Sequence, residues 1–128
     1  MPHRSVETPD APAAIGPYSP AVVHDEAKLI FVSGQIPIDP ATGELVSGSI
    51  AAETTRVLEN LRALLTAAGS GMDRVLKTTV YLTNLDDFAE MNETYARFFP
   101  GVPPARAALE VSRLPKGVRV EIEAVATL

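Results

Sequence analysis

The clearest alternation of apolar and polar residues lies near the C-terminus, in residues 118–126. Valine, isoleucine and alanine fill every second position there, and charged side chains, Glu121 among them, fill the positions between. A period of two is the pattern of a strand with one buried face. Residues 104–111 alternate in the same way, and residues 112–117 join the two runs with Pro and Gly as a turn would. We therefore expect Arg106 and Glu121 to point away from the apolar side of a sheet.

Three further segments have the pattern of strands. Residues 14–23 carry two prolines three positions apart, which predicts an edge strand or a strand entered through irregular backbone. The continuous apolar run 29–34 is typical of an inner strand that forms a hairpin with the first segment. The β-branched and apolar run 75–82 predicts a central strand. Residues 35–44, rich in turn residues, are predicted to form an ordered loop, and residues 1–14 a loose lead-in.

Two segments change to the helical period. Between Ser49 and Gly69, apolar residues recur every three or four positions, while charged residues fill the other face. Ser49 is the expected N-cap, and Gly69 is the residue expected just beyond the end of the helix. A second helix is predicted between a cap at Asn84 and Phe99, with aromatic and methionine side chains on its core face. Asn92 lies beside that face and is kept as a candidate for binding.

Two amphipathic helices can cover one face of a sheet of four or five strands. The predicted fold is therefore α+β, a two-layer sandwich with both helices on one face of the sheet, in a single domain over residues 1–128. The other face would carry Ala108 and Val125 among charged residues and would be exposed in a single chain. Another copy of the chain would cover it, so we expect a homo-oligomer.

Composition argues against several classes of protein. The chain has no cysteine, which removes disulfides, thiolate zinc sites and cysteine nucleophiles. The net charge of −5, with scattered basic residues, argues against a nucleic-acid partner. Neither a signal peptide nor a membrane-spanning apolar stretch is found, which predicts a cytoplasmic protein without a membrane partner. Neither His3 nor His24 has a partner at helical spacing, so no metal site is expected.

Three side chains together suit the hydrolysis of a small compound. Arg106 can grip a planar carboxylate with two charge-assisted hydrogen bonds. Glu121 can orient a water molecule and transfer its proton. With the phenol of Tyr18, in its Gly-Pro-Tyr-Ser-Pro setting, these groups fit a carboxylate-bearing substrate with a reactive electrophilic carbon. The competing interpretation is an ordinary solvated pair of Arg106 and Glu121 on the surface of a sheet.

Several short motifs follow one another over nearly the whole chain, in an order typical of one protein family. They lie at 14–18, 33–37, 42–44, 77–80, 87–88 with Asn92 and Tyr95, 104–106, 113–116 and 120–124. In this order they strongly resemble the Rid/YjgF family, the enamine and imine deaminases of the reactive-intermediate deaminase A group. Each motif is weak alone, but the set spans the family's full length.

The resemblance implies a chorismate-mutase-like trimer, with sheets around a central barrel, helices outward and clefts between subunits. It implies cofactor-free hydrolysis of 2-aminoacrylate or 2-aminocrotonate, and of their imine tautomers, to 2-oxo acids and ammonia. In the family's pattern the matching Arg106 holds the substrate carboxylate, Glu121 positions the attacking water, and Tyr18 helps to close the site. The expected lining residues are Ser33, Gly34, Phe88, Asn92 and Ala108. Many members have cysteine where this chain has Ala108, so any role of that thiol is absent.

Three other functions fit parts of the pattern. A non-enzymatic binding or regulatory trimer would hold 2-oxo acids in the same cleft, although Glu121 would repel such a ligand. RNA cleavage is reported for some relatives of the family, and the low basic content argues against it. A specialised subgroup would act on a different imine, a choice that depends on loops such as residues 37–47.

Overall fold

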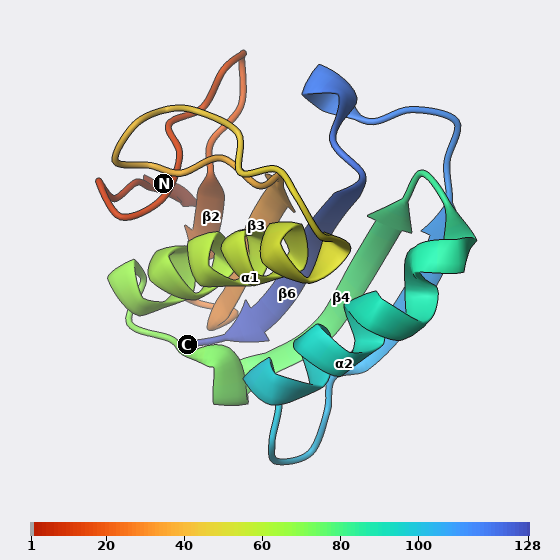
Figure 1. The fold of residues 1–128 in the computed structure, drawn as a ribbon. Helices are drawn as coiled ribbons and strands as arrows, with labels where there is room; N and C mark the ends of the chain where they lie inside the picture. The colour runs from red at the N-terminus through yellow and green to blue at the C-terminus, as the bar shows by residue number, and fades with distance from the viewer. Residues whose placement is uncertain (1) are drawn as a thin grey trace.

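The computed structural model describes residues 2–128, which form a six-stranded sheet and two α-helices in two layers (Figure 1). The strands are β1 (Arg4–Val6), β2 (Ala21–His24), β3 (Leu29–Gln35), β4 (Val75–Leu82), β5 (Ala105–Glu110) and β6 (Val120–Thr127). The helices are α1 (Ile50–Ala67) and α2 (Phe88–Phe98), and short 3-10 helices lie at Met72–Arg74, Leu85–Asp87 and Pro115–Gly117. Both α-helices cover the same face of the sheet, so the predicted two-layer α+β architecture is confirmed.

The strands follow the order β1-β2-β3-β6-β4-β5, and the last strand in the sequence therefore lies inside the sheet. The predicted β2–β3 hairpin is confirmed, and only β4 and β5 pair in parallel within the described residues. A parallel pair needs a crossover, and α2 supplies it between β4 and β5. This connection places α2 beside β4, while α1 crosses β3 and β6 (Figure 1).

The core lies between the sheet and the two α-helices, and α1 supplies most of the helical contribution. The apolar stripe of α1 is fully buried, as the helical period predicts, and it meets the alternate residues of β3, β4 and β6 that face the helices. The largest of these buried side chains include Ile30, Leu58, Leu61, Leu64, Val80 and Ile122. Ser49 caps α1 as predicted, because its Oγ accepts the N–H of Ala52 at 3.0 Å. Gly69 follows the helix with a φ of +85°, which suits glycine.

The N-terminal segment is not the loose lead-in that the sequence predicts. Residues Arg4–Val6 form β1, which pairs antiparallel with β2 and makes one edge of the sheet. Val6 and Ala11 are buried in the main core, so apolar contacts hold this segment in place. β2 begins at Ala21, directly after the two prolines, so the strand is entered through irregular backbone rather than lying at the edge.

The loop that follows β3 is ordered, as predicted. Asn60 of α1 is fully buried and donates hydrogen bonds from Nδ2 to the carbonyl oxygens of Ile36, at 3.3 Å, and Ile38, at 2.9 Å. Ile38 also forms an isolated antiparallel bridge with Leu45. The loop is thus tied to α1 at one point and closed on itself at another.

Candidate active site

Glu121 rests directly on the backbone of Gly34, where β6 lies beside β3. The register between these strands shifts between Val32 and Gln35, so Ser33 and Gly34 leave the regular ladder. A Cβ added to Gly34 would lie 2.0 Å from Oε2 of Glu121 and 2.8 Å from its Cδ. Glycine is therefore the residue that leaves room for this carboxylate.

A cavity of about 460 Å³ surrounds the Glu121 carboxylate. Its lining brings together four of the predicted site residues, Tyr18, Ser33, Gly34 and Glu121, together with Ile15, Ile36, Pro115 and Glu123. The hydroxyl of Ser33 donates to the Ser19 carbonyl at 2.6 Å, and the Tyr18 hydroxyl accepts the N–H of Ile15 at 3.3 Å. The first bond holds the proline-rich segment before β2 against β3 beside the cavity, and the second closes a turn within that segment.

The surroundings of Glu121 favour its protonated form. Burial raises the pKa of the Glu121 carboxyl above its ordinary value, and the charge of Glu123 on the same strand face raises it further. Glu123 in turn accepts a hydrogen bond from the hydroxyl of Tyr81 at 3.1 Å. Burial first, and then this bonded carboxylate, raise the pKa of the Tyr81 phenol. Glu121 therefore combines access to a cavity with an increased affinity for a proton.

Arg106 belongs to a second group of residues, formed by β5 and α2. Its Nη1 donates to Oδ1 of Asn92 at 2.8 Å. Its guanidinium carbon lies 4.8 Å from the ring centroid of Tyr95 and 5.5 Å from that of Phe88, which are cation–π distances. A cavity of about 580 Å³ is lined by Asn92, Tyr95, Pro104 and Arg106, among others. The structure thus brings together Arg106, Phe88 and Asn92, three of the predicted site residues.

Arg106 and Glu121 lie on opposite faces of the sheet. Arg106 pairs with Thr78 across β4 and β5, and Thr78 pairs with Ala124 across β4 and β6, so these three share the face that the helices cover. Glu121 is three residues from Ala124 along β6 and faces the other way. The predicted orientation is right for Glu121 and wrong for Arg106. One chain does not bring the two groups into the same cavity.

The error has a physical reason in the composition of β5. Its alternate positions are mostly alanine, so the alternation predicts the apolar side mainly from Leu109. In the structure Leu109 lies on the open face, with 39% of its surface exposed. Ala108 shares the face of Arg106 and packs against the core rather than lying on the open face as predicted. The open face does carry Val125, whose partner across β3 is the half-exposed Phe31.

Two aromatic residues near the predicted site were missed. Tyr95 is buried in the core as predicted, but its ring also lies against the Arg106 guanidinium, and its hydroxyl forms a 2.7 Å hydrogen bond with the Thr78 hydroxyl. Tyr81 is paired across the strands with Glu121, and it bonds Glu123 on the same face. The alternation of residues 75–82 does indicate that Tyr81 points away from the core. It does not indicate that β6, which carries Glu121, is the neighbouring strand.

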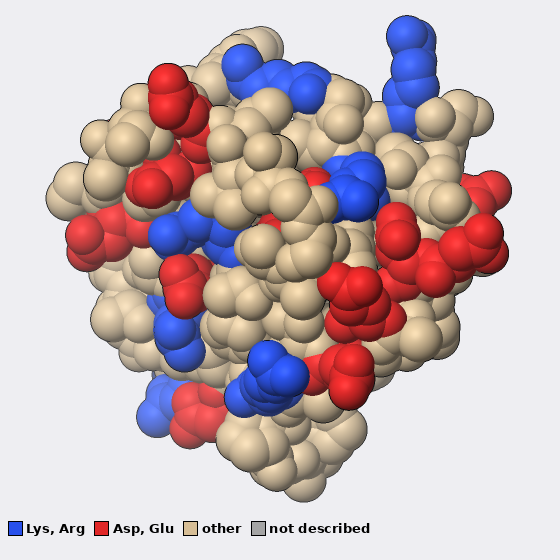
Figure 2. Space-filling view, viewed as in Figure 1, with Lys and Arg blue, Asp and Glu red and all other residues tan. Residues whose placement is uncertain are grey.

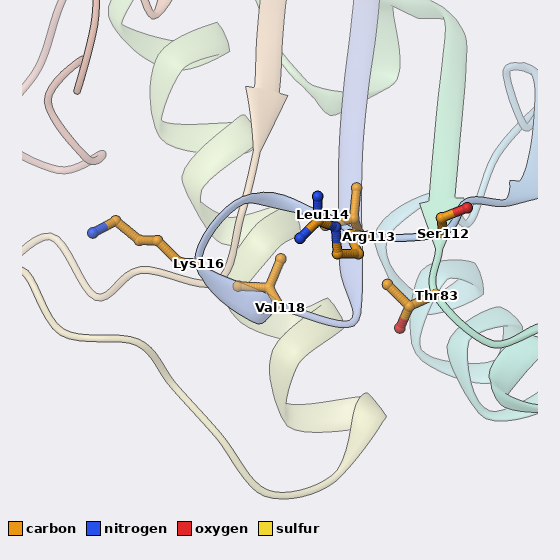
Figure 3. Close-up of a pocket in the computed structure, with 7 residues that line it drawn as sticks. Thr83, Ser112, Arg113, Leu114, Lys116 and Val118 are labelled. Carbon is orange, nitrogen blue, oxygen red and sulfur yellow. The ribbon is translucent and has the colours of Figure 1, made fainter.

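A cavity larger than these two lies elsewhere, at the loop that precedes β6 (Figure 3). It has a volume of about 690 Å³ and is lined by Thr83, Ser112, Arg113, Leu114, Lys116, Gly117 and Val118. In Figure 3 the side chain of Lys116 extends away from Thr83 and Ser112. The lining has no carboxylate or imidazole for acid–base chemistry, so we place the candidate site at Glu121 and Arg106 instead.

Metal-binding clusters and membrane-spanning helices are both absent from the described part of the chain. Among residues 2–128, no group of three or more His, Cys, Asp or Glu side chains is arranged to hold a metal ion. None of the helices in the same range has the length and apolar character needed to cross a membrane.

Comparison with known proteins gives close relatives over almost the full chain. Protein DfrA of Myxococcus xanthus is 52% identical over 126 residues, which cover 98% of this chain and 96% of the relative. The human protein named 2-iminobutanoate/2-iminopropanoate deaminase is 50% identical over 123 residues, which cover 96% of this chain and 88% of the relative.

Solved structures are equally similar. The Rid family protein YyfA from Yersinia pestis has a TM-score of 0.94 and 45% identity, covering 98% of this chain and 99% of that one. Escherichia coli TdcF, solved with bound serine, has a TM-score of 0.92 and 41% identity, covering 98% of each chain. The family model described as "Endoribonuclease L-PSP" matches residues 8–128. The chain therefore belongs to the Rid/YjgF family, as its motifs indicate.

Proposed function

We propose that this protein hydrolyses reactive enamine and imine intermediates, such as 2-aminoacrylate and 2-aminocrotonate, to 2-oxo acids and ammonia. The observation that carries the proposal is the pair of incomplete sites on opposite faces of the sheet. One offers a guanidinium for a carboxylate, and the other offers a proton-accepting group beside a cavity. The name of the human relative and the serine bound to TdcF, a small molecule with a carboxylate and a nitrogen, both support this substrate class.

The complete site requires at least two copies of the chain. Arg106 lies on the edge strand β5, where a neighbouring copy can approach it, and Glu121 lies on the face that the helices leave open. That face carries exposed apolar side chains, Phe31 and Leu109 among them, which a neighbour would cover. We therefore place the site between subunits of a homotrimer, with Arg106 from one copy and Glu121 and Tyr18 from the next.

Arg106 binds the substrate. Asn92 accepts one hydrogen bond from Nη1, which leaves the other guanidinium donors for the two oxygens of a carboxylate. The rings of Phe88 and Tyr95 hold the guanidinium plane in place. Ala108 has no side-chain functional group, so it contributes only its main chain. The imine carbon is bonded directly to the carboxylate carbon, so fixing the carboxylate of this small substrate also fixes the position of the imine carbon.

Glu121 moves the proton. The enamine reacts as its imine tautomer, whose nitrogen is protonated. As the water oxygen attacks the imine carbon, Glu121 accepts a proton from the water, and an amino alcohol forms. Glu121 then returns the proton to the amino nitrogen, and the C–N bond breaks to release ammonia. As the carbonyl forms, Glu121 takes the hydroxyl proton and passes it to the ammonia. The iminium ion and water thus give a 2-oxo acid and ammonium, with atoms and charge balanced.

A mixing experiment tests the shared site. Arg106→Ala and Glu121→Ala are each expected to abolish turnover in an assay coupled to a threonine dehydratase. When the two inactive variants are unfolded, mixed in equal amounts and refolded together, about one quarter of the sites regain both groups, because each copy is drawn at random. Activity should therefore return to about a quarter of the wild-type value.

The same experiment contains its own contradiction. If each chain formed a complete site alone, mixing would restore nothing, and the proposal of a shared site would be wrong. Each variant refolded alone is the control for incomplete inactivation. Sedimentation of the variants and of the mixture should show trimers throughout, and a monomeric wild-type chain would contradict the assembly.

RNA cleavage is the second candidate, because the matching family model is described as an endoribonuclease. The charge distribution does not favour it. Acidic side chains gather over α2 and the segment before it on the helix-covered face, and the chain has a net charge of −5 (Figure 2). Phosphate backbones bind clustered basic residues instead. A nuclease assay of the wild type and of Glu121→Ala would reveal an activity that depends on this site.

A further inference from the structure

The carboxylate of Glu123 stands beside Glu121 in a defined position. Both line the same cavity, and they lie two residues apart on the open face of β6. Tyr81 of β4 is paired with Glu121 across the strands, yet its hydroxyl donates to Oε1 of Glu123 at 3.1 Å. The phenol therefore holds the second carboxylate and leaves the first free to face the cavity.

We propose that Glu123, held by Tyr81, is a positioning residue that enables Glu121 to carry a proton during imine hydrolysis. This inference rests on the proposed function and assigns a role to a pair that the mechanism above does not use. Hydrolysis needs a group that takes a proton from water and then gives it to nitrogen, and a weakly basic carboxylate does this poorly at neutral pH. A fixed neighbouring anion raises the proton affinity of Glu121.

The other groups that face Glu121 do not supply this effect. From β3, Ser33 and Gly34 present no charge, and the Ser33 hydroxyl already bonds the Ser19 carbonyl. The segment before β2 contributes Tyr18 to the lining, and the turn before β6 contributes Pro115, neither of which is a carboxylate. In the proposed assembly, the Arg106 charge of the next copy is balanced by the substrate carboxylate. Burial and Glu123 are the two causes that raise the pKa of Glu121.

The hydrogen bond from Tyr81 explains why Glu121, and not Glu123, is the carboxylate that carries the proton. Without this bond, nothing in the arrangement would distinguish the roles of the two adjacent carboxylates. Tyr81 donates its hydrogen bond to Glu123 and not to Glu121, so Glu123 is fixed by a donor while Glu121 is left free to face the cavity and carry the proton. The assignment of roles thus follows from which carboxylate the phenol reaches.

The test is the pH dependence of kcat/KM. Glu123→Gln keeps the shape of the side chain and removes its charge, so the acidic limb of the profile should move to lower pH. Tyr81→Phe should move the limb in the same direction by less, because the Glu123 carboxylate remains but is no longer fixed beside Glu121 by the phenol. Glu26→Gln, in the exposed turn between β2 and β3, removes an equal charge and should leave the limb unchanged.

A measurement without turnover separates this inference from the proposed function. A carbon-detected NMR titration of the Glu121 carboxyl group should give a lower midpoint in Glu123→Gln than in the wild type. If the wild type lacks deaminase activity, the proposed function is wrong, and the proton-carrying role goes with it. If the wild type is active but neither the limb nor the midpoint moves in Glu123→Gln, the role of Glu123 alone is refuted.

Discussion

Replacing Gly34 by alanine should separate activity from stability. The new Cβ would lie 2.0 Å from Oε2 of Glu121, whereas such contacts essentially never fall below 3.0 Å, so the oxygen must move by about 1 Å, the difference between the two. A displacement of this size in a catalytic group costs roughly 100-fold in rate. We therefore expect kcat/KM of Gly34→Ala to fall by about two orders of magnitude in the coupled imine assay.

The stability of the fold should change little in Gly34→Ala. The atoms that the Cβ meets, at 2.0, 2.8 and 3.1 Å, all belong to the end of the flexible Glu121 side chain, which can turn away. The φ of Gly34 is outside the left-handed region, so alanine is allowed there, and it lowers the entropy of the unfolded chain. Urea unfolding should show a change in the free energy of unfolding below about 1 kcal/mol.

A double-mutant cycle checks that Gly34 acts through Glu121. In a Glu121→Ala background the carboxylate is gone, so adding Gly34→Ala should change the residual rate less than about twofold. The reasoning is refuted if Gly34→Ala alone keeps a kcat/KM within threefold of the wild type, or if a crystal structure of the variant shows the carboxylate in its original place.

Three further changes test the site and its support. Glu121→Gln should raise the free energy of unfolding at pH 7, because the raised pKa of Glu121 means that ionising this carboxyl destabilises the folded state. In urea unfolding curves measured at several pH values, the gain should vanish as the pH falls below 4.5, the ordinary pKa of the carboxyl group. Asn60→Ala should lower the free energy of unfolding by about 2–4 kcal/mol, measured with urea, because the carbonyls of Ile36 and Ile38 lose their buried donor. Arg106→Lys should lower kcat/KM by roughly 10- to 100-fold, mainly through KM in steady-state kinetics, because an ammonium group cannot grip a carboxylate at two points; an unchanged KM would contradict that role.

The local sequence pattern predicted an element correctly where all the signals for that element lie within its own segment. The helix after Ser49 has an N-cap, a repeated apolar stripe and a glycine at its end, and all three act within the segment itself. The strand at residues 29–34 and the last strand were equally clear from their apolar content. In these segments the surrounding fold only confirms what the neighbouring residues already favour.

Patterns failed where the answer depended on a partner far along the chain. The Ala-rich alternation of β5 has two nearly equivalent sides, and α2 decides between them by stacking Phe88 and Tyr95 on Arg106. β1 has only three residues, too few to show a period, and exists because β2 offers it an edge. The meeting of Gly34 with Glu121 arises from a register shift between β3 and β6, which neither strand encodes alone.

The division of Arg106 and Glu121 between the two sides of one sheet also affects how output scales with the amount of protein. A lone chain cannot present both groups to one small molecule, so any turnover that needs both vanishes at high dilution. In the proposed trimer, near the protein concentration at which the copies separate, the rate of turnover should rise more steeply than in proportion to the enzyme added. At low protein concentration, the activity per copy of the chain would thus be lower than at high concentration.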